Sequence, residues 1–224
     1  MQQKLKVYNG VDRRYNVYTI VKYGGEEMNK YEHMNKLLQE DNGYLITAQV
    51  EKAGISRTYL AKFVNENHLE KVAKGIYISQ DTWADELYIL QVCNPKIIYS
   101  GETALYLQGM IEREYTDICI TVPPRFSQTR LRSKGVIVHQ EKHAIYQLGV
   151  TEVETNYGNM VRTYNKERCI CDVIKNRKNI EVQQFQTAMK TFMRDKTKNM
   201  SRLMQYGEQL KIRDEIMKYV EMML

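Results

Sequence analysis

Apolar residues recur at three- and four-residue spacing near the start of the regular part of the chain. Tyr31, Met34, Leu37 and Leu38 would share one face of a helix. We predict that this helix ends at Asp41-Asn42-Gly43, because asparagine and glycine favour turn conformations. The spacing therefore predicts an amphipathic helix packed against a core.

Two further helices are predicted next, joined by a tight turn. Thr47 is placed to cap the first, and Gly54 can end it by taking a positive φ. Ile55 then points inward, and Ser56 caps the second, which runs to about residue 65. The apolar face of this second helix consists of Tyr59, Leu60, Phe63 and Val64, and its outer face of Arg57, Thr58, Ala61, Lys62 and Asn65. A helix, a glycine-containing turn and a helix with a cationic outer face are the helix-turn-helix arrangement.

The run from Leu69 to Ile78 predicts a β-hairpin with its turn at Gly75. A basic hairpin directly after the third helix is the wing of a winged helix-turn-helix. The lysines of the wing contact phosphates, and residues near the start of the preceding helix reach base edges in the major groove. The residues predicted to bind double-stranded DNA are Ser56, Arg57, Thr58, Tyr59, Lys62, Lys71 and Lys74. A winged helix used for protein contacts is the alternative, and Tyr59 suits core packing as well as a phosphate hydrogen bond.

The rest of the chain predicts a second domain of mixed strands and helices. Helices are expected over 81–93, with Trp83, Leu87 and Leu90 on one face, over 100–109 with Ser100 as its cap, and from Asn165 through Cys169 to 176; strands are expected at 97–99, 118–122, 136–139, 145–150, 152–155 and 161–164. Three amphipathic helices follow, over about 182–193, 200–210 and 212–223. The predicted fold class is therefore α+β, with a winged helix-turn-helix at 28–80 followed by a mixed α+β domain at 81–224 that ends in amphipathic helices.

The first 27 residues differ from the rest in lacking helical periodicity. They end in Gly24-Gly25-Glu26-Glu27 directly before Met28. Because glycine codons begin GG and glutamate codons begin GA, this peptide can be encoded by a purine-rich ribosome-binding site. We therefore predict that Met28 is the physiological start and that residues 1–27 are a non-native or disordered extension. A short N-terminal arm packed on the body is the alternative, and N-terminal sequencing of the native protein separates the two.

Net charge points to an anionic partner. The chain carries +6 overall, of which residues 28–80 carry +1 and residues 150–224 carry +4. The basic excess therefore lies mostly outside the predicted DNA-reading helix. No apolar run reaches the roughly 20 residues that cross a bilayer, and no secretory signal is recognisable, so a cytoplasmic protein that does not enter membranes is expected.

Residues suited to catalysis or metal binding are scattered. The cysteines Cys93, Cys119, Cys169 and Cys171 lack CxxC spacing, and the histidines His33, His68, His139 and His143 form no metal-binding pattern. No Asp-x-Asp occurs, and Glu152-x-Glu154 is expected on a solvated strand face. We therefore expect free thiols, no bound metal, no cofactor and no enzymatic activity.

Several blocks in order resemble the AbiEi family of antitoxins from type IV toxin–antitoxin systems, which are linked to abortive phage infection. The blocks are Gly54–Arg57, Leu69–Tyr77, Pro95–Leu107, Gly149–Glu154 and Arg168–Asp172. The likeness extends from Met28 to the C-terminal helices.

The resemblance implies two activities. The winged helix would repress its own operon by binding inverted repeats in the promoter, with two copies on the DNA and a monomer or weak dimer in solution. The C-terminal domain would counteract a nucleotidyltransferase-like toxin without forming a stable complex with it. Basic residues considered for the antitoxic surface are Arg162, Arg168, Lys175, Arg177, Lys178, Lys190 and Arg194. A DNA-binding regulator whose C-terminal domain senses a ligand is the alternative function.

Overall fold

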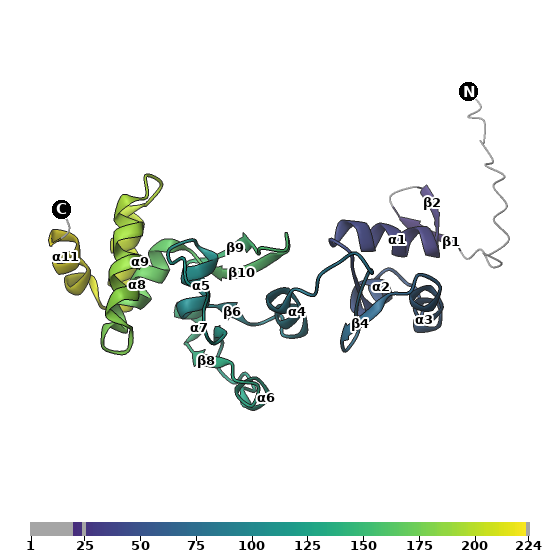
Figure 1. Cartoon of the computed structure of the whole chain (residues 1–224), viewed down its shortest axis with the longest axis horizontal. Coiled ribbons are helices and arrows are strands. Elements are labelled where there is room, and N and C mark those ends of the chain that lie inside the picture. The colour runs from purple at the N-terminus through teal and green to yellow at the C-terminus, as the bar shows by residue number, and fades with distance from the viewer. Residues whose placement is uncertain (1–19, 24–25, 223–224) are drawn as a thin grey trace, which may run out of the picture. The chain divides into compact units, whose positions relative to one another are not determined.

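The chain divides into two units, Met1–Ala84 and Asp85–Leu224, in a computed structural model that describes residues 20–23 and 26–222 (Figure 1). Most of the segment that we predicted to be an extension lies outside the described residues. Its end forms an antiparallel hairpin of β1 (Ile20–Tyr23) and β2 (Glu26–Asn29). The assignment of Met28 as the start therefore stays a prediction.

Unit 1 places three helices against a small antiparallel sheet. After the hairpin its elements are α1 (Lys30–Glu40), β3 (Tyr44–Ile46), α2 (Thr47–Lys52), α3 (Arg57–Glu66), β4 (Glu70–Ala73) and β5 (Ile76–Ile78). The sheet has the order β3-β5-β4, so β5 lies between the strand before α2 and the strand after α3. The predicted succession of three helices and a hairpin is confirmed.

The core of unit 1 explains why α2 and α3 meet at a fixed turn. Gly54 takes a φ of +76° after α2, and Ile55 next to it is 1% exposed among apolar side chains from all three helices. Asn29 caps α1 through a complete capping box with Glu32. The predicted cap by Thr47 is wrong: Thr47 is the first helical residue, and its backbone N–H donates to the carbonyl oxygen of Gly75 at 2.8 Å.

Unit 2 is built on a mixed sheet of order β8-β7-β6-β10-β9. Its elements are α4 (Glu86–Cys93), β6 (Ile98–Tyr99), α5 (Gly101–Leu107), β7 (Cys119–Val122), α6 (Thr129–Arg132), β8 (Ile137–Gln140), α7 (His143–Tyr146), β9 (Val150–Glu154), β10 (Met160–Tyr164), α8 (Lys166–Lys175), the 3-10 turn η1 (Arg177–Asn179), α9 (Val182–Arg194), α10 (Met200–Leu210) and α11 (Arg213–Glu221). The pairs β6–β10 and β7–β8 are parallel, whereas β6–β7 and β9–β10 are antiparallel. The expected mixture of helices and strands is confirmed.

One predicted helix of unit 2 begins later than expected, and one predicted strand is wrong. The helix expected from residue 81 begins only at Glu86, because Asp85 caps it by accepting from the Tyr88 N–H. Trp83 therefore lies before the helix, in unit 1, and is 79% exposed instead of packing with Leu87. The strand expected at 145–150 is replaced by α7 and a turn at Gly149.

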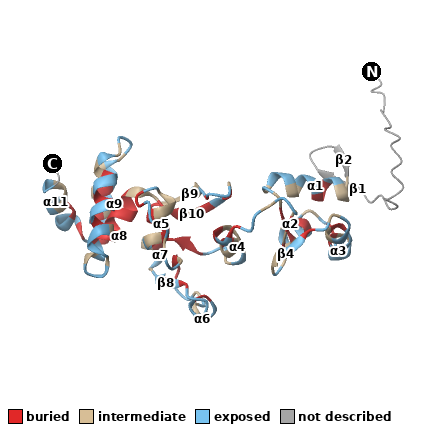
Figure 2. Cartoon of the chain, viewed as in Figure 1, coloured by how far each residue is buried: buried red, intermediate tan, exposed pale blue. Residues whose placement is uncertain are grey.

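Helix α8 is the centre of unit 2. It contacts α5, α9, α10 and α11, and seven of its ten residues are buried. Figure 2 shows this burial along α8, and the apolar cluster there extends from α5 to α11. Cys169 and Cys171 both belong to this core, and desolvation raises the pKa of the Cys171 thiol to about 12. Both thiols are therefore packing residues at physiological pH.

We expect Gly149→Ala to lower the free energy of unfolding of unit 2 by about 1–3 kcal/mol. Gly149 has a φ of +78°, and an added Cβ would lie 2.7 Å from Cβ of Arg168. Urea denaturation followed by circular dichroism measures the change. Gly109→Ala is the matched control, since Gly109 has a φ of +64° but no atom within 4 Å of the added Cβ. Equal losses in both variants would mean that backbone strain alone, and not contact with α8, requires a glycine at 149.

Candidate nucleic-acid interface

Helix α3 is held by its apolar face and presents a polar face outward. Leu60 and Phe63 are buried, and the Phe63 ring packs edge-on against Tyr31 of α1 at a centroid distance of 5.5 Å. The opposite face consists of exposed Arg57, Thr58, Ala61, Lys62 and Asn65. Ser56 stands exposed at the N-cap and makes no side-chain cap hydrogen bond. A flat partner would therefore meet the first two turns of α3 without moving the core.

Arg57 is the most prominent cation of this face. Its side chain is 79% exposed, and its Nε donates to Oε1 of Glu51 in α2 at 2.5 Å. The hydrogen bond and the charge of Glu51 raise the pKa of Arg57 above its ordinary value. Among the described residues only Nε of Arg57 has a partner, so the two terminal nitrogens of the guanidinium are available to a bound molecule. Glu51 of α2 therefore holds the side chain of Arg57 at the start of α3.

Two other predicted residues of α3 have partners within unit 1. The ring of Tyr59 is partly buried, and Nζ of Lys30 lies 4.3 Å from its centroid. Lys62 lies 3.7 Å from Glu66, one turn further along α3. Such exposed pairs contribute little to stability, so either lysine could exchange its present partner for a phosphate of a bound polyanion. Sequence reasoning missed Lys30, whose place beside Tyr59 depends on how α1 packs on α3.

The hairpin of β4 and β5 carries the two predicted wing lysines. Lys71 is exposed on β4 opposite Tyr77, and Lys74 is exposed in the turn before Gly75. Gly75 has a φ of +75°, and its carbonyl oxygen accepts from the N–H of Thr47. The turn is thereby fixed to the start of α2. Lys52, at the end of α2, is a further exposed cation, which the sequence pattern did not indicate.

The basic residues considered for an antitoxic surface differ in exposure and in their partners. Lys178, Lys190 and Arg194 are exposed on η1 and α9. The others have partners: Arg162 donates to the carbonyl oxygen of Pro95, Lys175 pairs with Glu141 at 3.5 Å, and Arg177 lies over the ring of Phe185.

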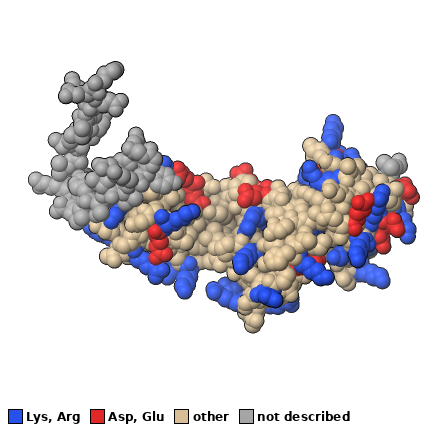
Figure 3. All heavy atoms as spheres, turned by 180° about the vertical axis from the view of Figure 1, so that it is seen from behind, with Lys and Arg blue, Asp and Glu red and all other residues tan. Residues whose placement is uncertain are grey.

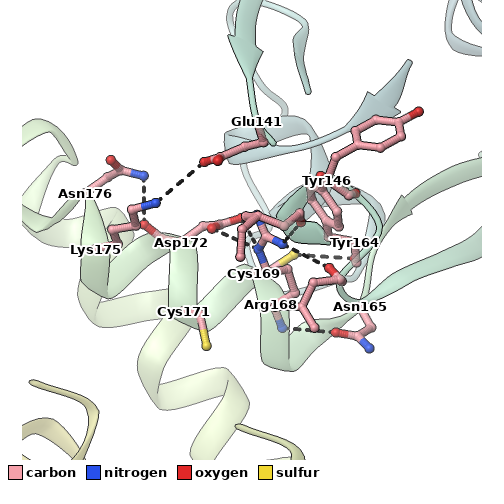
Figure 4. A network of polar contacts seen from close by, with 12 residues as sticks. Glu141, Tyr146, Tyr164, Asn165, Arg168, Cys169, Cys171, Asp172, Lys175 and Asn176 are labelled. Atoms are coloured by element: carbon pink, nitrogen blue, oxygen red, sulfur yellow. Dashed lines mark hydrogen bonds and ion pairs between the residues drawn. The ribbon is translucent and has the colours of Figure 1, made fainter. Parts of the chain in front are cut away.

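The assignment of Arg168 to an antitoxic surface is wrong, because its side chain is buried and cannot form part of an exposed surface. The residue is 1% exposed, and its Nε lies 3.0 Å from Oδ1 of Asp172. Its Nη1 donates to the carbonyl oxygens of Ile145 and Leu148, which ties α8 to the segment around α7 (Figure 4). The guanidinium also lies 4.4 Å from the ring centroid of Tyr164. Arg168 therefore stabilises the fold of unit 2.

Comparison with known families found one similarity for unit 1. Residues 30–114 match the family model described as transcriptional regulator, AbiEi antitoxin N-terminal domain. Residues 30–114 are therefore similar to the N-terminal domain of AbiEi antitoxins. The AbiEi match begins at α1, includes all elements through β5, and continues into unit 2 past α5.

Two further comparisons accompany the AbiEi match. The crystal structure of the RV2827C protein from Mycobacterium tuberculosis is similar over 89% of this chain and 82% of that chain, with 10% identity and a TM-score of 0.43. Among curated proteins, no match was found. Within the described residues, no helix is long and apolar enough to cross a bilayer, and no cluster of metal-ligating side chains is formed.

Proposed function

We propose that this protein is a bifunctional antitoxin of a type IV toxin–antitoxin system, in which unit 1 represses its own operon. The observation that carries the proposal is the match of residues 30–114 to the AbiEi antitoxin N-terminal domain, a family described as a transcriptional regulator. Its order of helix, strand, two helices and hairpin, with the sheet order β3-β5-β4, is typical of a winged helix-turn-helix. In this proposal α3 is the recognition helix and the β4–β5 hairpin is the wing.

The proposed binding mode assigns different tasks to the two elements. Arg57 and Thr58 at the start of α3 read base edges in the major groove, and Ser56, Tyr59 and Lys62 support them. Lys71 and Lys74 neutralise phosphates and carry no sequence information. Inverted repeats require two copies of the protein, one on each half-site. The binding step involves no cofactor and no catalysis.

A gel shift on the protein's own promoter tests the repressor function. The full chain should retard a duplex that contains the inverted repeats and should do so in two steps, one for each half-site. A duplex of the same composition with the repeats scrambled is the control. Equal affinity for both duplexes would remove the repressor function.

Lys74→Ala is expected to weaken binding to both duplexes by the same factor. The variant should also reduce the slope of log Kd against log salt concentration by about 0.9, since each lost phosphate contact releases one counterion fewer. Fluorescence anisotropy at several salt concentrations measures both quantities. Loss of affinity for the promoter duplex alone would contradict a phosphate-binding role for the wing.

The second proposed activity is neutralisation of a nucleotidyltransferase-like toxin encoded beside this gene, without a stable complex. Co-expression should restore growth of cells that produce the toxin, while the two proteins elute separately in gel filtration. Lys178, Lys190 and Arg194 are the exposed residues that we would substitute first. Co-elution of the two proteins would contradict neutralisation without a stable complex and would indicate direct inhibition of the toxin.

A regulator that senses a small ligand is a second function favoured by one observation. Unit 2 contains a cavity of about 600 Å³ whose lining includes Ser100, Glu102, Asp117 and His139. The Ser100 hydroxyl is buried without a hydrogen-bond partner among the described residues. Release of promoter DNA by a small-molecule extract of the cells would favour this function, whereas growth rescue in the co-expression test favours the antitoxin.

A further inference from the structure

The cavity of about 600 Å³ in unit 2 lies over the edge of the sheet formed by β7 and β8. Cys119 pairs in register with Ile137, and Thr121 with His139, and all four residues line the cavity. They form its floor, because residues two apart on a strand share one face of the sheet. The other lining residues come mainly from α8 and the start of α5. The cavity is therefore built from fixed elements and has the size of a small-molecule site.

The lining of the cavity contains two more carboxylates than cations, with histidine counted as neutral. Both cations are already paired with carboxylates of the same lining. Nε of Arg168 lies 3.0 Å from Oδ1 of Asp172, and Nζ of Lys175 lies 3.5 Å from Oε1 of Glu141 (Figure 4). Two further carboxylates of the lining therefore remain without a cation from it.

These two carboxylates belong to Glu102, at the start of α5, and Asp117, just before β7. Neither forms an ion pair with a described residue. Both act on the thiol of Cys119, whose pKa is raised by burial and also by their negative charges. Elsewhere in unit 2 the two signs are mixed: Figure 3 shows acidic and basic side chains side by side at the end formed by the C-terminal helices, and Glu208 pairs there with Arg213. The cavity thus holds negative charge that the described residues do not compensate.

The hydroxyl group of Ser100 is a third polar group of the cavity. Ser100 is 3% exposed, and its backbone N–H donates to the carbonyl oxygen of Cys119 at 3.0 Å. Its Oγ is buried without a hydrogen-bond partner among the described residues. A buried hydroxyl in this state destabilises a fold unless another molecule completes its hydrogen bonds. Exposure falls from Asp117 through half-buried Glu102 to Ser100, so the three groups lead from the surface inward.

We propose that this cavity binds a small organic molecule through a primary ammonium group, which donates to Glu102, Asp117 and Ser100; as the ligand of a regulator, this molecule rests on the second proposed function, ligand sensing. A primary ammonium has three N–H donors and no acceptor, which matches three oxygen acceptors. Its hydrogen bonds to carboxylates are charge-assisted and therefore strong.

Other classes of ligand fit the cavity less well. A phosphate or carboxylate ligand would meet the excess of negative charge. A metal ion would need a cluster of ligating side chains, and the described part of the chain contains no group of three or more suited to one. The uncompensated carboxylates and the unpartnered hydroxyl are both satisfied by an organic amine.

The probe for the amine site is 1,4-diaminobutane, which carries an ammonium group at each end of a short chain. Its controls are 1,4-butanediol, which has the same chain without charge, and succinate, which has negative charges instead. NMR titration of the full chain, without DNA, gives the dissociation constant and locates the site by the shifts of the amide signals of residues 100–102 and 117–119. The diamine should bind with a Kd of about 1 mM or lower. The diol and succinate should bind at least roughly tenfold more weakly.

The double variant Glu102→Gln with Asp117→Asn should weaken binding of the diamine at least roughly tenfold, because both charged acceptors are lost. Ser100→Ala should weaken it by about threefold or more. The matched control is Glu112→Gln with Glu114→Gln, which removes the same charge from exposed positions that do not line the cavity. This control should keep the wild-type Kd. Circular dichroism and thermal unfolding verify that all three variants fold.

Three results would overturn the inference: no saturable shift at residues 100–119, equal affinity for the diol and the diamine, or equal losses in the two double variants. Because the titration contains no DNA, its outcome does not depend on the repressor function. Ligand sensing is tested separately, by comparing how the diamine changes the affinity of wild type and of the Glu102→Gln, Asp117→Asn variant for the promoter duplex. An equal change in both, together with binding in the cavity, would remove the sensing function and leave the amine site.

Discussion

Arg168→Ala is expected to lower the free energy of unfolding of unit 2 by about 3–5 kcal/mol, the usual cost of removing one partner from a buried ion pair. The substitution leaves the carboxylate of Asp172 without its guanidinium and leaves the carbonyl oxygens of Ile145 and Leu148 without their donor. Urea denaturation measures the loss, and hydrogen exchange of the α8 amides assigns it to unit 2. Arg194→Ala, an exposed position on α9, should change the free energy by less than about 0.5 kcal/mol.

The free energy of unfolding that Arg168→Ala loses should also depend on pH. Burial already raises the pKa of Asp172 above 3.8, although Arg168 acts against that rise. Without Arg168 the pKa of Asp172 rises further in the folded state, so the variant loses stability as the pH rises from the pKa of the unfolded chain towards that raised pKa, and the loss is complete above it. The difference between wild type and variant is therefore expected to be larger at pH 7 than near pH 4. A pH-independent difference would mean that lost packing and carbonyl hydrogen bonds, and not the stranded carboxylate, cause the destabilisation.

Much of unit 1 could be predicted because local signals and core packing agree there. Gly54 and Gly75 both take the positive φ that the turns require, and the 3- and 4-residue spacing in α3 buries Leu60 and Phe63. The partners of the outward residues could not be predicted in the same way. The pairing of Arg57 with Glu51 depends on the angle between α2 and α3, and the residue spacing within either helix does not determine that angle.

The misses in unit 2 have a common cause, which is tertiary packing that overrides local pattern. The run 145–150 alternates like a strand, yet Tyr146 instead donates its hydroxyl to the carbonyl oxygen of Lys96 from a short helix. Arg168 looked like a surface cation because arginine is rarely buried. It is buried here because four acceptors from α8 and the α7 segment surround it, and only the folded chain brings them together.

Arg57→Ala is expected to reduce discrimination between the promoter repeats and a scrambled duplex by roughly ten- to a hundredfold, the contribution of a good bidentate base contact. Glu51 holds only Nε of Arg57, so both terminal nitrogens of the guanidinium can donate to one guanine. Competition anisotropy with the two duplexes, at one fixed salt concentration, measures the ratio of the two dissociation constants.

Lys52→Ala is the matched control for Arg57→Ala, since it removes an exposed positive charge at the end of α2, outside the helix that reads the bases. It should weaken binding to both duplexes equally and leave the ratio unchanged, as Lys74→Ala should in the wing. The ratio therefore separates base reading from charge, because loss of a charge alone cannot change it. If Arg57→Ala also left the ratio unchanged, Arg57 would be a phosphate contact, and base reading would have to come from Thr58 or the following turn of α3.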